Sequence, residues 1–179
     1  MTLNDILVST LAQLDRGHDA QTLDAWRGKL TQFANDALLD LSYTFKPVRT
    51  ETTDAGIGII DTNSLSREFV KAVCVRIGDS VIGFPDAFQG EYISVDANGP
   101  VELTYQYVPK PLSSPTDVPE IPDRLHGLIV TYTVARERMS GDVTTQKGSS
   151  PYMQLYEQGK RAARYGSGLP DGYSIINRW

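Results

Sequence analysis

The residue types that most often do chemistry are sparse in this chain. Its 179 residues include one cysteine, Cys74, and two histidines, His18 and His126, which stand far apart in the sequence. A structural zinc site needs four such ligands, so this set cannot supply one. Cys74 lies among apolar residues of a predicted strand, which indicates an inert buried thiol. His126 stands beside an apolar helical stripe, which favours a partly buried or boundary histidine, with a general base as the alternative.

Two short segments come close to known ligand-binding motifs. The run from Gly56 to Asp61 (GIGIID) is near a dinucleotide-binding motif, but its sixth position is Asp and no helical pattern follows. We interpret its glycines as a turn into a short strand. An acidic cluster lies among prolines and consists of Asp117, Glu120 and Asp123. Stabilisation of a helix N-terminus explains the presence of Asp123 and Glu120. A calcium site is the alternative, although the central glycine of a calcium loop is missing.

Cationic and large apolar residues gather toward the C-terminal end. Lys160, Arg161 and Arg164 lie near the end of a predicted helix, where they either complement the helix dipole or form a patch for acidic residues of a partner. Residues 166–179 show no periodicity. They nevertheless contain Leu169, Tyr173, Ile175, Ile176 and Trp179, each of which would gain about 1.5–3 kcal/mol by burial. A partner surface should therefore cover this segment, which fully extended reaches about 46–50 Å.

Hydrophobic periodicity places helices at both ends of the chain. Apolar residues recur at helical spacing over 3–15, 22–42, 122–139 and 151–165. Thr2 is the expected N-cap of the first helix, and Gly17 is expected to stop it. Asp19 or Thr22 is the expected cap of the second helix. The short loop between the first two helices predicts that they pack as an antiparallel pair.

The period changes to two residues between 48 and 110, which predicts a small antiparallel sheet of roughly four to six strands. Asn98-Gly99 indicates a hairpin between strands 92–95 and 101–107. Gly78-Asp79 indicates a second hairpin, between strands 69–77 and 80–84. The proline-rich residues 109–122 predict an extended, semi-rigid crossing from the sheet to the third helix.

These elements predict an α+β fold. A four-helix body, with two N-terminal and two C-terminal helices, has a small antiparallel β-sheet inserted between the helix pairs. We expect one domain over 1–165 and an extended C-terminal arm over 166–179. The sequence indicates no catalytic residue, no cofactor and no metal, which favours a protein that is not an enzyme.

Composition narrows the possible partners. The formal net charge of −5 disfavours a protein that binds nucleic acid by neutralising phosphates, although DNA could slide past an acidic wall. No apolar run is long enough for a membrane span. The N-terminus is acidic where a signal peptide would be basic, and one cysteine allows no internal disulfide, so we expect synthesis in a cytoplasm.

Three segments together resemble bacteriophage head–tail connector proteins, the adaptor subunits beneath the portal that are similar to the tail-tubular adaptors of short-tailed phages. The most specific segment is 118–136 (VPEIPDRLHGLIVTYTVAR), in which a proline and a short acidic turn precede an apolar helix ending Tyr-x-x-Ala-Arg. A later helix with the pattern Tyr-x-x-Leu-Tyr-x-x-Gly spans 152–159, and the strand 101–107 is followed by Val-Pro. The resemblance covers about residues 1–165, and the arm matches only in position and apolar character.

The resemblance implies a structural protein of the virion neck that is assembled in the host cytoplasm. Connector subunits form a ring on the portal protein, usually dodecameric, which extends the DNA channel and offers a docking surface to tail or nozzle proteins. Double-stranded DNA passes through without specific binding, and no membrane is involved. The arm would extend onto the portal, with a portal interface made by Arg161, Arg164, Tyr173, Ile175, Ile176 and Trp179.

Three other classes of protein stay open. A tail-completion or head-closure protein would also belong to the virion, but such proteins are dominated by strands, whereas four long helices are predicted here. A cellular protein-interaction module could have the same α+β fold. A small hydrolase would need a clustered pair of titratable residues in a pocket, and the sequence offers no recognisable set.

Overall fold

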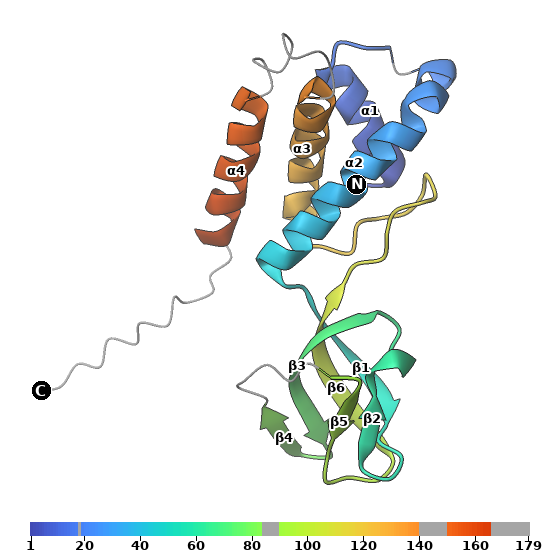
Figure 1. Cartoon of the computed structure of the whole chain (residues 1–179), viewed down its shortest axis with the longest axis vertical. Helices are drawn as coiled ribbons and strands as arrows, with labels where there is room; N and C mark the ends of the chain where they lie inside the picture. The colour runs from blue at the N-terminus through green and yellow to red at the C-terminus, as the bar shows by residue number, and fades with distance from the viewer. Residues whose placement is uncertain (18, 84–89, 140–149, 166–179) are drawn as a thin grey trace, which may run out of the picture. The chain divides into compact units, whose positions relative to one another are not determined.

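The computed structural model describes residues 1–17, 19–83, 90–139 and 150–165 (Figure 1). Among them are four α-helices and six antiparallel strands, so the chain has a mixed α/β fold. It divides into two compact units. The helical unit comprises Met1–Ala37 and the described residues from Pro122 onward, and the β unit comprises Leu38–Ile121. The expected arm, 166–179, lies outside the described residues, and a single domain over 1–165 stays a prediction. No described helix is both long and apolar enough to cross a bilayer.

Helix α1 (Leu3–Gln13) begins with the predicted cap. The Thr2 hydroxyl accepts a hydrogen bond from the Asp5 amide, and the Asp5 carboxylate accepts one from the Thr2 amide at 2.8 Å. This reciprocal capping box satisfies two amides at the helix start. The predicted stop at Gly17 is wrong, because the helix ends earlier, where Asp15 adopts a left-handed φ of 56°. A short polar side chain tolerates that conformation better than most residues do.

Helix α2 (Ala20–Phe45) starts directly after Asp19. The Asp19 carboxylate accepts a hydrogen bond from the Thr22 amide at 3.1 Å, so Asp19 is the capping residue of the two that the sequence offered. At the other end Lys46 has a left-handed φ of 48°, directly before Pro47, which lacks the amide that another helical turn would need. Residues 20–37 of this helix belong to the helical unit and the remainder to the β unit.

Helix α3 (His126–Met139) is the central helix of the helical unit and follows a 3-10 turn over Asp123–Leu125. It packs against both α1 and α4 (Ser150–Tyr165). Its buried residues, which point in several directions around the axis, are His126, Ile129, Val130, Thr133, Val134, Ala135 and Glu137. Helix α1 has its closest backbone contacts with α3, and antiparallel packing of the first two helices stays a prediction.

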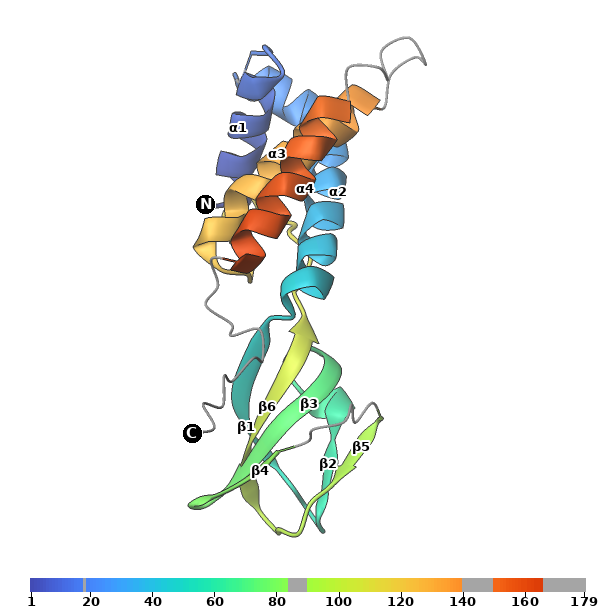
Figure 2. The same ribbon diagram turned by 90° about the vertical axis from the view of Figure 1, so that its left-hand side faces the viewer.

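The β unit contains two antiparallel sheets (Figure 2). The larger has the order β1-β6-β3-β4 and the smaller pairs β2 with β5. The strands are β1 (Val48–Asp54), β2 (Ile59–Asp61), β3 (Glu68–Ile77), β4 (Ser80–Gly83), β5 (Tyr92–Ser94) and β6 (Pro100–Val108). Both sheets contribute to one apolar core, formed by Ala55, Ile60, Ala72, Val75, Ile93, Val101, Leu103 and Tyr105. The short sheet therefore covers one face of the larger one, as in a small sandwich.

One of the two predicted hairpins is confirmed and the other is wrong. Ile77 pairs with Ser80 around the Gly78-Asp79 turn, and Gly78 has the positive φ (57°) that such a turn requires. The Asn98-Gly99 pair also reverses the chain, but β5 pairs with β2 whereas β6 pairs with β1 and β3. A turn motif shows where the chain reverses. Here burial of β5 over the core decided which strand it would pair with.

Residues 109–121 form a closed loop, not the predicted extended crossing. The Tyr107 hydroxyl donates to the Glu120 carbonyl oxygen at 3.0 Å, so the chain returns to where it left β6. A fully extended segment of 13 residues would span about 43–47 Å. The tip is held by Asp117, whose carboxylate accepts hydrogen bonds from the Ser113 and Ser114 amides, both at 2.7 Å. Compact loops with their ends together are a common form of ordered surface loop.

A comparison of two glycines tests the turn that leads into β2. Gly58 has φ +83°, and a Cβ added there would lie 2.9 Å from the backbone carbonyl oxygen of Val95. We expect Gly58→Ala to lower the free energy of unfolding by about 2–3 kcal/mol, because it adds a clash to the cost of a left-handed backbone. Gly78→Ala is the matched control: its φ is also positive, but nothing lies within 4 Å. Urea unfolding should show a loss of about 1 kcal/mol for the control, and equal losses would contradict the packing described.

Candidate functional site

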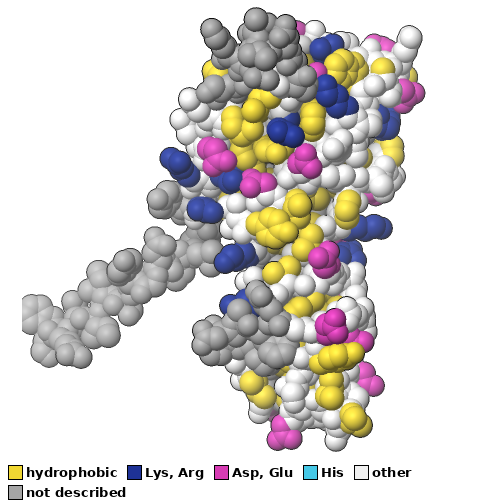
Figure 3. Space-filling model, viewed as in Figure 1, with side chains coloured by type: hydrophobic (Ala, Val, Ile, Leu, Met, Phe, Trp, Pro, Cys, Tyr) yellow, Lys and Arg dark blue, Asp and Glu magenta, His cyan; other side chains and the backbone are white. Residues whose placement is uncertain are grey.

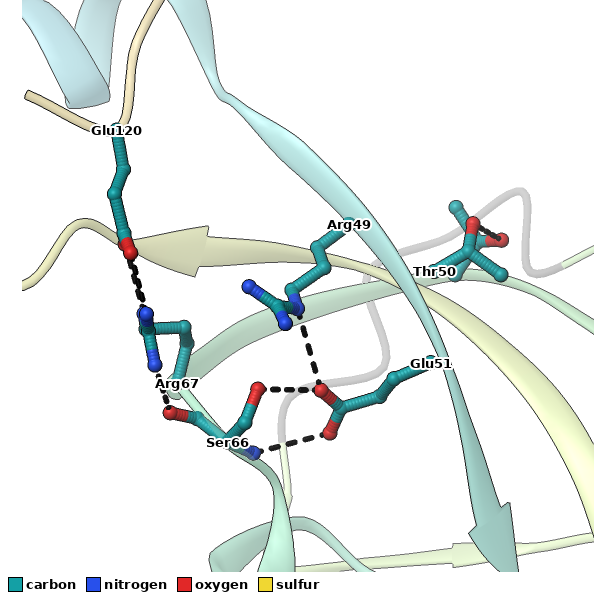
Figure 4. A network of polar contacts seen from close by, with 7 residues as sticks. Arg49, Thr50, Glu51, Ser66, Arg67 and Glu120 are labelled. Carbon is teal, nitrogen blue, oxygen red and sulfur yellow. Dashed lines mark hydrogen bonds and ion pairs between the residues drawn. The ribbon is translucent and has the colours of Figure 1, made fainter.

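A bidentate ion pair between Arg67 and Glu120 joins the segment before β3 to the end of the closed loop (Figure 4). Arg67 Nε donates to Glu120 Oε2 at 2.7 Å, and Arg67 Nη2 donates to Glu120 Oε1. The third guanidinium nitrogen, Nη1, donates to the carbonyl oxygen of Ser66 at 2.7 Å. About a quarter of each charged side chain is exposed, so water only partly screens the pair. The hydrogen bond from Arg67 holds the pKa of the Glu120 carboxyl below its ordinary value and raises that of the guanidinium.

A second carboxylate binds the same segment from strand β1. Glu51 accepts hydrogen bonds from the Ser66 amide at 3.0 Å and from the Ser66 hydroxyl at 2.5 Å, and Arg49 Nε lies 3.4 Å from it. Burial pushes the pKa of Glu51 upward, but the Ser66 hydrogen bonds and the Arg49 charge together bring it below its ordinary value. Figure 4 shows that Glu51 and Glu120 hold the segment at residues 66 and 67 from two sides.

Two tyrosines of β6 lie beneath this network. The Tyr105 side chain is fully buried, and its hydroxyl has no hydrogen-bond partner among the described residues, although Ser66 and Glu51 lie near it. Burial raises the pKa of both Tyr105 and Tyr107, and the nearby carboxylates raise it further. Both phenols therefore stay protonated at neutral pH. With two ionised carboxylates that are fully engaged, the network suits mechanical fixation of a loop better than proton transfer.

An open groove of about 670 Å³ lies beside the network, within the β unit. Its lining mixes apolar and polar groups and comprises Tyr43, Thr62, Asn63, Leu65, Ser66, Arg67, Glu68, Phe69, Val70, Gly90, Glu91 and Val108. Nowhere in the described ranges do three His, Cys, Asp or Glu residues gather closely enough to hold a metal.

The three acidic residues of the predicted cluster each have a separate role. Asp117 closes the loop tip, and Glu120 binds Arg67, so helix N-terminus stabilisation is the wrong explanation for Glu120. Asp123 lies in the first turn of the 3-10 segment, as expected, with Oδ1 3.7 Å from His126 Nδ1. His126 is fully buried, not at the boundary, and Cys74 is only half-buried, on β3.

The predicted cationic patch on α4 is present in part. Arg161 and Arg164 are exposed. Lys160 is turned inward instead, with Nζ 3.3 Å from Glu157 and 5.1 Å above the ring of Tyr156. The other four predicted interface residues, Tyr173, Ile175, Ile176 and Trp179, lie outside the described residues.

Helix α4 is anchored to α3 by one aromatic pair. The buried Tyr156 ring meets Tyr132 edge-on at 5.0 Å, and Gly159 allows a close approach to Leu128. Leu155 is 56% exposed. It shares the outer side of α4 with Gln158 and Arg161, so this side is both apolar and cationic. Figure 3 shows apolar and charged side chains interspersed over the visible face of the helical unit.

The Arg67–Glu120 and Glu51–Ser66 contacts were not predicted from the sequence. Arg67 and Glu120 are 53 positions apart, and although Glu120 belongs to segment 118–136, nothing in that pattern indicates Arg67 as its partner. Comparison with models of known protein families finds no matching family, and a search of characterised proteins returns no match. The resemblance to connector proteins therefore stays a prediction from the sequence.

A double-mutant cycle measures what the ion pair contributes. We expect Arg67→Ala and Glu120→Gln to show a coupling energy of about 1–2 kcal/mol in urea unfolding, because the pair is two-pronged and partly shielded from water. Arg76 and Glu102 provide the control pair, since their atoms are 3.8 Å apart and both side chains are more than half exposed. Their coupling should be about 0–0.5 kcal/mol. Equal coupling in the two pairs would mean that Arg67 and Glu120 do not hold the loop.

Acidification should weaken the same network. Glu51 and Glu120 have lowered pKa values in the folded protein and return to about 4.3 when it unfolds. Their stabilisation is therefore complete above the unfolded pKa and is lost as the pH falls through the folded values. Thermal unfolding followed by circular dichroism should show a falling midpoint below about pH 4.3, with a shallower fall for Glu120→Gln. Glu102→Gln, at an exposed position on β6, should keep the wild-type slope, and the same slope in all three proteins would refute the assignment.

Proposed function

We propose that this chain is a bacteriophage head-to-tail adaptor that assembles as a ring on the portal protein. In that role it extends the DNA channel and offers the tail a docking surface. The protein would act by assembly, without catalysis or a cofactor, in the neck of the virion. Its partners would be the portal, neighbouring copies of itself in a ring of about twelve, and tail or nozzle proteins.

The role of segment 118–136 is the observation that supports this proposal most. Within the β unit, Pro119 and Ile121 are buried at the end of the closed loop. Within the helical unit, Tyr132 contacts α4, and the Arg136 guanidinium lies 5.4 Å from the Phe33 ring on α2. The residues that resemble the connector pattern thus have packing roles, some in the closed loop and others in helix α3.

The finer arrangement of the fold belongs to the same proposal. The helices would form the body of the ring, with the β region inserted between the two helix pairs in chain order. Arg161 and Arg164 are exposed on α4 directly before residue 166, so a cationic surface precedes the expected arm. We propose that these arginines and the arm residues Tyr173, Ile175, Ile176 and Trp179 contact the portal.

The overall charge agrees with a channel through which DNA slides. A formal net charge of −5 gives the chain little attraction for phosphates. An acidic lumen would repel passing double-stranded DNA and keep it from adhering. A tail-completion or head-closure protein is the second candidate, favoured by the size of the β unit, Leu38–Ile121.

Co-purification with the portal protein of the same genome tests the proposal. We expect the full-length chain to bind the portal, and a chain truncated after Tyr165 to lose at least tenfold in affinity because the arm anchors are gone. Arg161→Glu with Arg164→Glu should weaken binding as well. Arg76→Glu, at an exposed position on β3, is the matched charge-reversal control and should bind normally. Circular dichroism checks that each variant is folded.

Two outcomes would count against this assignment. Failure of every form to bind the portal would remove the portal-facing role and favour a position further down the tail. Equal binding by the full-length and truncated chains would keep the adaptor role but take the contact away from the arm.

A further inference from the structure

Among the described residues, nothing pairs with the two edges of the larger sheet of the β unit. β1 and β4 are its outer strands, and each pairs with a single neighbour (Figure 2). No backbone hydrogen bond from another described residue reaches the outward side of either strand. An uncovered edge is a ready template for pairing with another chain.

Edge β4 carries none of the side chains that usually prevent such pairing. Its four residues include no charge and no proline, and all four are exposed. Val81 is 57% and Ile82 42% exposed, so both offer apolar surface to a partner. Natural edge strands commonly carry lysine, proline or a bulge that prevents association. Edge β4 therefore has the properties of an interface strand.

The geometry of the hairpin between β3 and β4 determines which backbone groups of β4 point outward. With a two-residue turn, Ile77 and Ser80 form the first hydrogen-bonded pair, and Val75 and Ile82 form the next. The amide and carbonyl of Val81 then point away from the sheet. Because Val75 is buried, its partner Ile82 lies on the core face, and Val81 lies on the outer face.

The same reasoning applies to β1. Backbone hydrogen bonds join Pro47 to Tyr107 and Ala55 to Gly99, so the odd-numbered positions between them face β6. The even-numbered residues point their amides and carbonyls outward, namely Val48, Thr50, Thr52 and Asp54. Their side chains lie on the outer face, opposite to the buried Val101, Leu103 and Tyr105. Val48 is itself 58% exposed.

The two edges are therefore complementary in direction and in face. A sheet of four antiparallel strands has outer strands that run in opposite directions, so β4 of one copy meets β1 of the next in antiparallel pairing. The residues that point outward on both edges have their side chains on the same face, so the core faces of neighbouring copies stay aligned. Cyclic symmetry preserves strand direction along its axis, which makes this head-to-tail contact compatible with a closed ring.

We propose that copies of this chain join edge to edge, with Val81 of one copy pairing beside Thr50 and Thr52 of its neighbour. The inference rests on the proposed assembly of the chain into a ring. It does not depend on whether the ring binds the portal. It adds to the proposed helical ring body a subunit contact in the β unit, where the sheets of neighbouring copies would form one continuous sheet. At about 4.8 Å per strand, four strands add about 19 Å of wall per copy, so twelve copies would give a circumference of about 230 Å.

Cysteine cross-linking tests the contact directly. In a Cys74→Ser background, Val81→Cys and Thr50→Cys on one chain should give a ladder of covalent oligomers with a short bis-maleimide. Opposite residues have Cβ atoms about 4.5–5.5 Å apart and diagonal ones about 7–8 Å, so the linker tolerates either register. Within one copy the two edges are separated by about 14 Å, beyond the reach of the linker. The reaction is run on concentrated protein alone and on its complex with the portal.

The single-cysteine chains distinguish the head-to-tail contact from a symmetric one. A mixture of the two single variants should give dimers that contain one of each, and neither variant alone should cross-link. Dimers of Val81→Cys alone would show a two-fold contact between β4 strands and would overturn the proposal. A pair made of Val81→Cys and Gln158→Cys, with the second cysteine on α4, should give no ladder.

A backbone substitution tests the same contact without a cross-linker. Val81→Pro removes an outward amide while leaving the hydrogen bonds to β3, so the variant should fold. Sedimentation velocity should show association weakened about tenfold or more, whereas Val81→Thr, which keeps the amide, should associate normally. A ladder without portal binding would leave this contact standing and remove the portal role. A ring on the portal without the ladder, or absence of the ladder under both conditions, would refute the contact.

Discussion

The path of the chain through the β unit depends on the ion pair between Arg67 and Glu120. Strand β6 ends at Val108 and the chain then runs through a proline-rich loop, in which prolines remove backbone donors and leave little regular hydrogen bonding. The two-pronged contact, together with the Tyr107 hydroxyl, returns residue 120 to the sheet. The buried side chains of Leu112 and Ile121 also anchor the loop. The neighbouring Glu51–Ser66 contact fixes the segment from which Arg67 projects.

Different groups of the chain hold the loop and remain available for contacts with partners. The charged network is engaged in holding the loop, and its groups have pKa values that keep them ionised or protonated at neutral pH. The surfaces that remain for partners are backbone edges, exposed apolar side chains and the cationic outer side of α4. Such surfaces are suited to repeated contacts between subunits, where geometry matters more than the chemistry of one residue. This distribution supports the proposal of a structural assembly protein.

Local features of the fold could be predicted from the sequence, whereas pairings distant in the sequence could not. Thr2, Asp19 and the Gly78-Asp79 turn act within a few residues, so helix starts and one hairpin were predictable. The Asn98-Gly99 turn was also visible, but the partner of β5 depends on burial of Ile93 against the other sheet. The closed loop depends on residues 53 positions apart. Of the predicted interface residues, Arg161 and Arg164 are exposed, while the arm lies outside the described residues.

Electron microscopy of the full-length chain mixed with the portal protein of the same genome tests the central claim most directly. The account predicts an additional ring of density on the tail-facing side of the portal, built from a cyclic array of this chain. Portal particles that look the same with and without the added chain, at concentrations well above those used for purification, would contradict it.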